Sequence, residues 1–163
     1  RIAGWERGGP QAAGAGLFRD RRWLLCPVEA TPRQHCESVR EMLAPTGARF
    51  GTMDPSLHDR VFAEVSHWPH AVAFALSAAI ASGELAEEAI EYSGAGLRDT
   101  SRIGASSPTL WAGILLDNRE ACLASAARFR GQLDEIVAAL EAGDRDRLAE
   151  VFAAASRWRS RLG

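Results

Sequence analysis

Apolar residues recur at helical spacing through almost the whole chain after Asp54, and this pattern excludes a large sheet from that part of the protein. Asp54-Pro55 supplies a cap and a first turn, and the helix that follows is expected to continue to Gly83. Shorter helices are predicted over residues 84–90 and 98–105. The sequence therefore indicates a mainly α fold.

The longest helix is predicted to begin after the Ser107-Pro108 cap and to run from Thr109 to about Glu141, where Gly143 stops it. At 1.5 Å per residue, roughly 30 residues span about 45 Å. Such a helix carries more apolar surface than one small domain covers. We therefore expect a homodimer through the long helices, with a monomeric bundle as the alternative.

The N-terminal third has a different pattern, in which two short apolar runs flank one helix. A buried strand is expected over Trp23–Cys26, a helix capped by Thr31 follows, and residues 48–53 form a second strand. Strand, helix and strand at this length predict a parallel βαβ unit. Two strands make a poor sheet, so we expect further strands upstream of Arg1. The predicted domains are residues 1–53 (a short α/β remnant) and 54–163 (all α).

Composition restricts the class of partner. The 163 residues carry a formal net charge of −2, which gives no basic excess for nucleic acid. Cys26, Cys36 and Cys122 form no metal or disulfide spacing, which fits a reducing cytoplasm. The longest apolar run, residues 68–81, is shorter than the ~20 residues of a membrane span, so no membrane partner is expected.

Two histidines on one helix are the first candidates for chemistry. His67 and His70 are three residues apart and share a helical face, and Pro69 between them is expected to bend the axis. They can donate to a ligand oxygen, or simply be satisfied by hydrogen bonds in a helix interface. A metal site completed by Glu64 is the least favoured reading, because no recognised zinc spacing is present.

Arg102 is the best candidate anchor for an anion, because a guanidinium matches a carboxylate in a bidentate fashion. The simpler alternative is a surface ion pair with Asp99, and Arg98 is one helical turn away and could share either role. Trp111 either closes a pocket wall or packs in the core. The chain has no GxGxxG, P-loop or GxSxG motif, so no nucleotide-binding apparatus of its own is expected.

Several motifs occur in a characteristic order along nearly the whole chain. They are Ile2-Ala3-Gly4-Trp5-Glu6-Arg7, Gly9-Pro10, Leu17-Phe18, Leu25-Cys26-Pro27, His58-Asp59-Arg60-Val61, Ser66-His67-Trp68-Pro69-His70, Gly96-Leu97-Arg98-Asp99-Thr100-Ser101-Arg102-Ile103, Ser107-Pro108-Thr109-Leu110-Trp111 and Asn118-Arg119-Glu120. In this order they resemble the prephenate and arogenate dehydrogenases of tyrosine biosynthesis.

The resemblance implies a two-domain enzyme in which a Rossmann domain binds NAD or NADP and a helical domain dimerises and completes the substrate site. This chain resembles the helical domain preceded by the last βαβ portion of the Rossmann domain. The catalytic histidine of the family would precede Arg1, so the resemblance implies none in this chain. Gly8 and Trp5 depart from the family pattern near the expected mouth of the site.

The resemblance also implies roles for individual residues. Arg102 would hold a carboxylate of the small-molecule substrate, while Ser66, His67 and His70 would line the pocket of the cyclohexadiene ring. Trp111 would shape the far wall, from the partner subunit or from across the cleft. Two alternatives stay open: a dehydrogenase of 4-amino-4-deoxyprephenate in secondary metabolism, and a non-catalytic helical dimer that serves as an interaction module.

Overall fold

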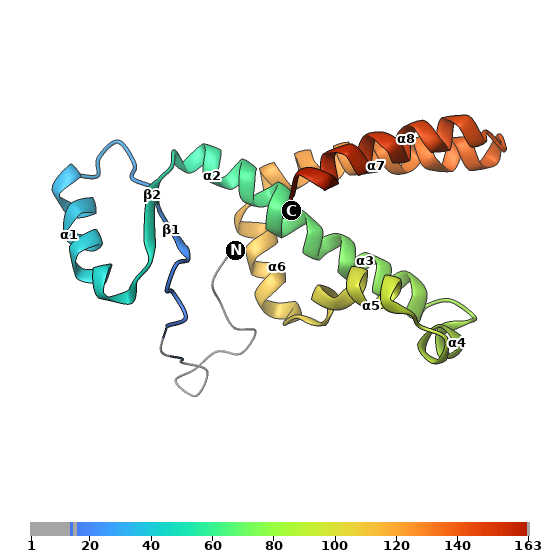
Figure 1. Cartoon of the computed structure of the whole chain (residues 1–163), viewed down its shortest axis with the longest axis horizontal. Helices are drawn as coiled ribbons and strands as arrows, with labels where there is room; N and C mark the ends of the chain where they lie inside the picture. Colours follow the sequence, from blue (N-terminus) through green and yellow to red (C-terminus); the bar gives the residue numbers. More distant parts are fainter. Residues whose placement is uncertain (1–13, 15, 163) are drawn as a thin grey trace. The chain divides into compact units, whose positions relative to one another are not determined.

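The computed structural model describes residue 14 and residues 16–162. These fall into two compact units, which cover residues 1–122 and 123–163. The motifs between Ile2 and Pro10, with the departures at Trp5 and Gly8, lie outside the described residues. The first unit contains one βαβ segment and a group of helices (Figure 1).

The βαβ segment forms as predicted. Strand β1 (Arg22–Leu25) and strand β2 (Arg49–Thr52) pair in parallel, with Trp23 opposite Phe50. Helix α1 (Arg33–Leu43) and the 3₁₀ turn η2 (Ala44–Thr46) connect them.

The predicted cap of α1 is wrong. Pro32 occupies the N-cap position, and the hydroxyl of Thr31 instead accepts a hydrogen bond from the backbone N–H of Val28 at 3.1 Å. Thr31 therefore stabilises the turn before the helix, which competes with capping for the same oxygen. Gly47, which follows η2, adopts a φ of +73°, and this left-handed conformation explains why the helix stops there.

Three helical segments follow without a break in the chain: α2 (Pro55–Phe62), the π-helical segment η3 (Ala63–His67) and α3 (Trp68–Ala81). Asp54 caps α2 as predicted, because its side chain accepts from the backbone N–H of Leu57 at 2.8 Å. The irregularity expected at Pro69 takes the form of η3, which ends two residues before it. A π segment inserts a residue into the helix, so the side chains after it are rotated relative to those before it.

Two short helices, α4 (Ala86–Glu91) and α5 (Ala95–Ser101), lead into the 3₁₀ segment η4 (Arg102–Ala105). The helix predicted over residues 98–105 therefore begins three residues earlier and tightens at Arg102. Segment η4 packs closely on α3, because a Cβ added at Gly104 would lie 2.9 Å from the carbonyl oxygen of Ala73.

The long helix predicted from Thr109 to Glu141 is wrong, because the structure divides it. Helix α6 (Pro108–Asp117) ends at Asn118, and α7 (Arg119–Glu141) begins immediately afterwards. Asn118 has φ −113° and ψ 36°, outside the helical region. Its side chain leaves the helix to bond elsewhere, which supplies the physical reason for the break. Ser107 caps α6 by accepting from the backbone N–H of Leu110 at 3.4 Å.

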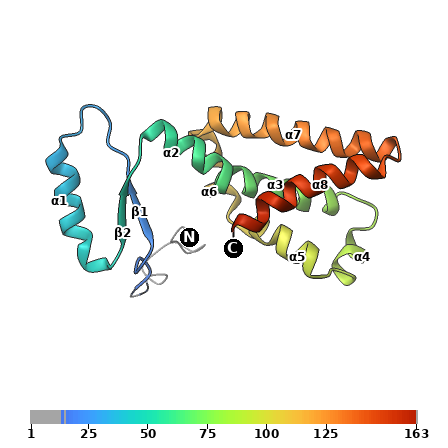
Figure 2. The same cartoon turned by 45° about the horizontal axis from the view of Figure 1, so that its top comes forward.

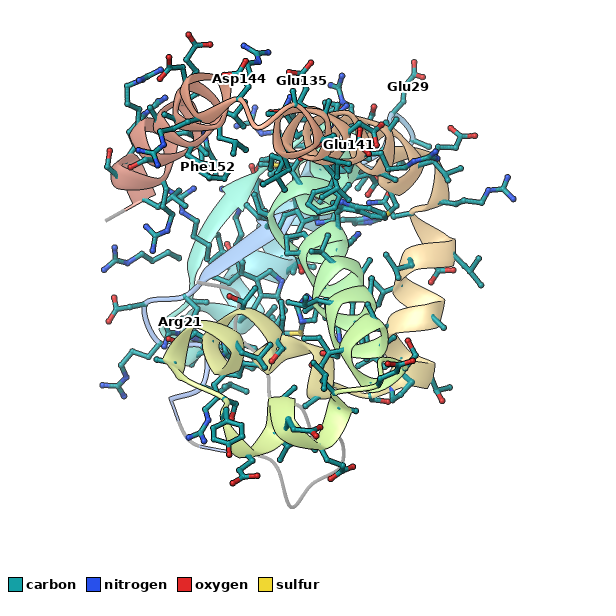
Figure 3. All side chains as sticks on the ribbon, turned by 90° about the vertical axis from the view of Figure 1, so that its right-hand side faces the viewer. Arg21, Glu29, Glu135, Glu141, Asp144 and Phe152 are labelled. Atoms are coloured by element: carbon teal, nitrogen blue, oxygen red, sulfur yellow. The ribbon has the colours of Figure 1, made fainter. Side chains whose placement is uncertain are left out.

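The second unit is a helical hairpin made by the distal part of α7, helix α8 (Arg145–Arg159) and the 3₁₀ turn η5 (Ser160–Leu162) (Figure 2). Gly143 turns the chain with φ +64°, and Asp144 caps α8 by accepting from Arg147 N–H at 2.9 Å. An ion pair between Arg147 and Glu135 joins the two helices. Ala139 is buried in this unit, whereas Phe152, labelled in Figure 3, is 53% exposed.

Among the described residues, large apolar side chains are half-buried or exposed, and none is fully buried. The buried apolar residues are small: Ala63, Ala73, Cys122 and Ala139. Cys26 and Cys36 are free thiols and half-buried, whereas Cys122 is a buried free thiol. Within the described residues, no helix combines the length and the apolar character that crossing a bilayer requires. The prediction of a mainly α chain with a short βαβ segment is confirmed.

Candidate functional site

An aromatic stack between helices α3 and α6 forms the centre of the site. The imidazole of His70 lies on the indole of Trp111, with ring centroids 3.4 Å apart and an interplanar angle of 16°. His67 approaches the same indole edge-on, with centroids 6.4 Å apart at 68°. The three rings are all half-buried. The structure therefore brings together three of the five predicted site residues.

Ser66, the fourth, contributes through its backbone. Its carbonyl oxygen lies 2.8 Å from Nδ1 of His70. A carbonyl oxygen only accepts, so Nδ1 of His70 carries a proton. In the neutral ring Nε2 is then an acceptor, and it lies on the side of the ring away from Ser66.

Aromatic and ionisable residues of α2 surround His67. The Phe62 ring lies 6.5 Å from the His67 ring, and His58 stacks on Phe62 at 4.2 Å. Nδ1 of His58 bonds Oδ1 of Asp59 at 3.0 Å.

The pKa of His67 is lowered from its ordinary value. Burial is the largest cause, and repulsion from His58 and His70 adds to it, while Asp59 acts in the opposite direction. His67 is therefore held in its neutral form near pH 7.

Asn118 connects α6 to this cluster, although no role in the site was predicted for it. Its side-chain Nδ2 donates to the backbone carbonyl of Asp59 at 2.7 Å and lies 3.1 Å from Nδ1 of His67. A signal existed in the sequence, because asparagine competes with the helical backbone for hydrogen bonds and favours helix ends. Asp117-Asn118 inside an otherwise helical pattern therefore could have indicated the break.

Arg102, the predicted anion anchor, makes no contact with the stacked rings within the described part of the chain. Its side chain is exposed on η4, and among the described residues it makes no hydrogen bond or ion pair. The alternative surface pair with Asp99 does not form either. Segment η4 packs on α3 at Ala73 and Ser77, one to two turns beyond His70. The guanidinium is thus left available for a ligand near the same helix.

Trp111 stacks on His70 of the same chain, and its role as a wall of the substrate pocket stays a prediction. Within the described part of the chain, no group of three or more His, Cys, Asp or Glu side chains is placed so that it could hold a metal ion. The arrangement offers flat apolar ring faces and one imidazole acceptor, and an exposed cation, Arg102, is carried by a segment that packs on the same helix α3. It suits a small, planar, negatively charged ligand.

Comparison with known families decides the relationship. Residues 54–154 match the profile of the prephenate dehydrogenase dimerization domain, and residues 2–52 match that of the prephenate dehydrogenase nucleotide-binding domain. The chain belongs to the prephenate dehydrogenase family. The resemblance drawn from the ordered motifs is confirmed.

Two characterised relatives illustrate the similarity. A cyclohexadienyl dehydrogenase of Zymomonas mobilis is 34% identical over 93% of this chain and 52% of its own length. A prephenate dehydrogenase of Bacillus subtilis is 32% identical over 99% of this chain and 44% of its own length. The chain thus spans about half the length of the relatives that it matches.

Solved structures show the same fold. Prephenate dehydrogenase of Aquifex aeolicus, in complex with hydroxyphenyl propionate and NAD⁺, superposes with a TM-score of 0.88 at 29% identity, over 99% of this chain and 57% of that one. Arogenate dehydrogenase of Synechocystis gives a TM-score of 0.84 at 27% identity, over 99% of this chain and 59% of that one.

Proposed function

We propose that the intact protein to which this chain belongs is an NAD(P)-dependent dehydrogenase of tyrosine biosynthesis, which oxidatively decarboxylates prephenate or arogenate. Family membership and the relatives' activities support this proposal. The observation in this chain that carries it is the stack of His70 on Trp111, with His67 at the edge of the same indole. Two flat faces and two imidazoles suit a six-membered ring that bears oxygen substituents.

In this proposal the chain binds and orients the substrate. Arg102 holds a carboxylate, and a charged hydrogen bond of this kind contributes roughly 1.5–3 kcal/mol. Ser66, His67 and His70 line the ring pocket, and Trp111 forms one wall. Departure of hydride from C4 is coupled to loss of the ring carboxylate as carbon dioxide, because the product becomes aromatic. Orientation of the ring therefore matters more than acid strength.

The nicotinamide nucleotide supplies the hydride acceptor of the reaction. The described residues do not fit the pyrophosphate of such a nucleotide, because the connection from β1 to α1, residues 26–32, contains no glycine and no phosphate-binding turn. We assign residues 1–53 to the edge of the nucleotide-binding domain and residues 54–163 to the dimerisation and substrate domain. NAD or NADP is then held mainly by parts of the protein outside this chain.

We also propose a homodimer formed through α7 and α8. In the second unit, apolar residues at helical spacing on α7 are 39–62% exposed: Phe129, Leu133, Val137 and Leu140. On α8, Phe152 and Trp158 are 53% and 60% exposed. A monomer seldom leaves such a stripe in water, and a second copy of the same stripe is the simplest cover. The free cysteines among the described residues fit a cytoplasmic location.

The decisive experiment is a substrate panel with the intact protein. Prephenate, arogenate and 4-amino-4-deoxyprephenate are each incubated with NAD⁺ and NADP⁺, and the reduced nucleotide and carbon dioxide are measured. Equal amounts of both products with prephenate or arogenate are expected. Turnover of the amino-substituted compound alone would identify the protein as a 4-amino-4-deoxyprephenate dehydrogenase of secondary metabolism. If no combination of substrate and nucleotide is turned over, the result would favour the alternative of a non-catalytic helical dimer.

A further inference from the structure

The side-chain amide of Asn118 lies within hydrogen-bond distance of the His67 imidazole and can determine which ring nitrogen carries the proton. It leaves the end of α6 and reaches two groups, the backbone carbonyl of Asp59 and the ring of His67. Both groups lie more than fifty residues earlier in the chain. The helix is interrupted at this residue, and α6 and α7 are therefore separate helices where Asn118 makes these contacts.

The carbonyl of Asp59 fixes which way the amide points. A carbonyl oxygen only accepts, so the atom 2.7 Å from it must be the amide nitrogen and cannot be the amide oxygen. The same nitrogen lies 3.1 Å from Nδ1 of His67. An amide nitrogen carries two hydrogens, so it can donate to both neighbours at once.

A donor facing Nδ1 determines the tautomer of His67. Nδ1 must be the bare, accepting nitrogen, and the ring proton must then lie on Nε2. We infer that Asn118 is a positioning residue that holds His67 as the neutral Nε2–H tautomer, so that His67 presents a hydrogen-bond donor on the side of the ring away from Asn118.

The two histidines of the site are then complementary. Ser66 puts the proton of His70 on Nδ1, which leaves Nε2 of a neutral His70 as an acceptor. Asn118 gives His67 the opposite arrangement. The pair offers one donor and one acceptor, so it suits a ligand that carries both an acceptor oxygen and a hydroxyl proton. This last step rests on the proposed function, whereas the tautomer of His67 does not.

The ionisable residues around His67 also favour its neutral form. His58 and Asp59 act on His67 from α2, and His70 acts from α3, while α6 presents the uncharged Trp111 and Asn118. A proton on Nδ1 would meet the N–H of Asn118 head-on. Burial and the two histidines also lower the pKa of His67, and only Asp59 opposes them.

Nitrogen NMR on the intact protein tests the inference directly. Long-range ¹H–¹⁵N spectra of histidine-labelled protein distinguish a protonated ring nitrogen from a bare one, and a His67→Gln variant identifies the His67 signals. At pH 7.5 we expect a bare Nδ1 and a protonated Nε2. A protonated Nδ1 in the unsubstituted protein overturns the inference, whatever the variants do.

Two substitutions at Asn118 and one beside it complete the test. Asn118→Asp replaces the donor with a carboxylate and is expected to move the proton to Nδ1 and raise the pKa of His67 by about one pH unit or more. Asn118→Ala removes the donor and is expected to give a mixture of tautomers. Asp117→Asn changes the adjacent exposed residue by one atom and should leave the His67 signals unchanged.

The outcomes separate this inference from the proposed function. Unchanged His67 signals in both Asn118 variants would overturn the positioning role even if the enzyme turns over prephenate. The expected tautomer in a protein without turnover would support the role and count only against the proposed function. Where Asn118→Asp fails to fold, Asn118→Ala and the unsubstituted protein still give a decisive result.

Discussion

The imidazole of His70 stacks face to face on the indole of Trp111, at a centroid distance of 3.4 Å. The stack joins α3 to α6 and leaves Nδ1 of His70 bonded to the carbonyl of Ser66. It therefore fixes the plane of the imidazole by two independent contacts. Aromatic stacking of this kind contributes about 0.5–1.5 kcal/mol beyond burial.

Trp111→Ala is expected to lower kcat/KM for prephenate or arogenate more than tenfold, because the His70 ring loses the surface that orients it. Trp111→Phe keeps a flat face and should retain most of the activity. Steady-state assays of both variants at saturating nucleotide check this. Equal losses in the two variants would mean that the flat face is not what the site needs.

Arg102→Ala is expected to raise the KM for substrate by about ten- to hundredfold, which corresponds to the loss of one charged hydrogen bond. The KM for nucleotide should change little. Arg98→Ala is the matched control, because Arg98 precedes Arg102 by one helical turn. Unlike Arg102, Arg98 already has a partner, since its Nε donates to Oγ of Ser93 at 3.2 Å. A larger effect in Arg98→Ala would assign the anion-binding role to that residue.

Local chemistry explains how much of the fold the sequence predicted. The caps at Asp54 and Ser107 depend on residues within a few positions, and they form where predicted. The parallel pairing of β1 and β2 follows from strand, helix and strand of the right length. These features need no knowledge of distant contacts.

The features that the sequence did not predict depend on contacts between residues far apart in the chain. The break between α6 and α7 depends on the bonds of Asn118 to Asp59 and His67, which lie far away in the sequence. The stack of His70 on Trp111 likewise depends on how α6 returns to α3, which no local pattern in the sequence indicates. The sequence identified the residue types of the site, but not which neighbour each ring contacts.

The stability of the protein is expected to fall as the pH drops below about 6.5, the ordinary value for histidine. The pKa of His67 is lowered in the folded state, so the unfolded chain binds more protons in this range and acid favours unfolding. The contribution is complete above pH 6.5 and is lost as the pH falls toward the folded-state pKa.

Thermal unfolding at pH 5 and 7.5 checks this dependence. His67→Gln cannot be protonated and should show a smaller difference in Tm between the two pH values than the unsubstituted protein. His35→Gln replaces an exposed histidine of α1 and serves as the control. An identical pH dependence in His67→Gln would remove His67 as the cause.

Val137→Lys is expected to dissociate the proposed dimer. Val137 lies in the exposed apolar stripe of α7, and a buried lysine without a partner is costly at an interface. Ala138→Lys adds the same side chain at an exposed position about 100° around the helix, off that stripe. Light scattering after gel filtration should give a monomer mass for the first variant and a dimer mass for the second. A monomer in the unsubstituted protein would contradict the proposed assembly.

Gly104→Ala tests whether η4 and α3 pack as tightly as their geometry requires. The new Cβ would lie 2.9 Å from the carbonyl oxygen of Ala73 and 3.0 Å from Oγ of Ser77. The first of these is backbone and cannot rotate away, so the segment that carries Arg102 must move. We expect a loss of about 1–3 kcal/mol in the free energy of unfolding.

Gly113→Ala is the control for this substitution. A Cβ there meets nothing within 4 Å, and Gly113 lies inside α6, where alanine stabilises a helix by up to about 1 kcal/mol. Urea denaturation should therefore move the midpoint down for Gly104→Ala and up for Gly113→Ala. Gly104 and Arg102 lie in the same short segment, η4. Gly104→Ala should therefore also raise the KM for substrate, whereas Gly113→Ala should not. An unchanged midpoint for Gly104→Ala would mean that η4 does not hold Arg102 against α3 in solution.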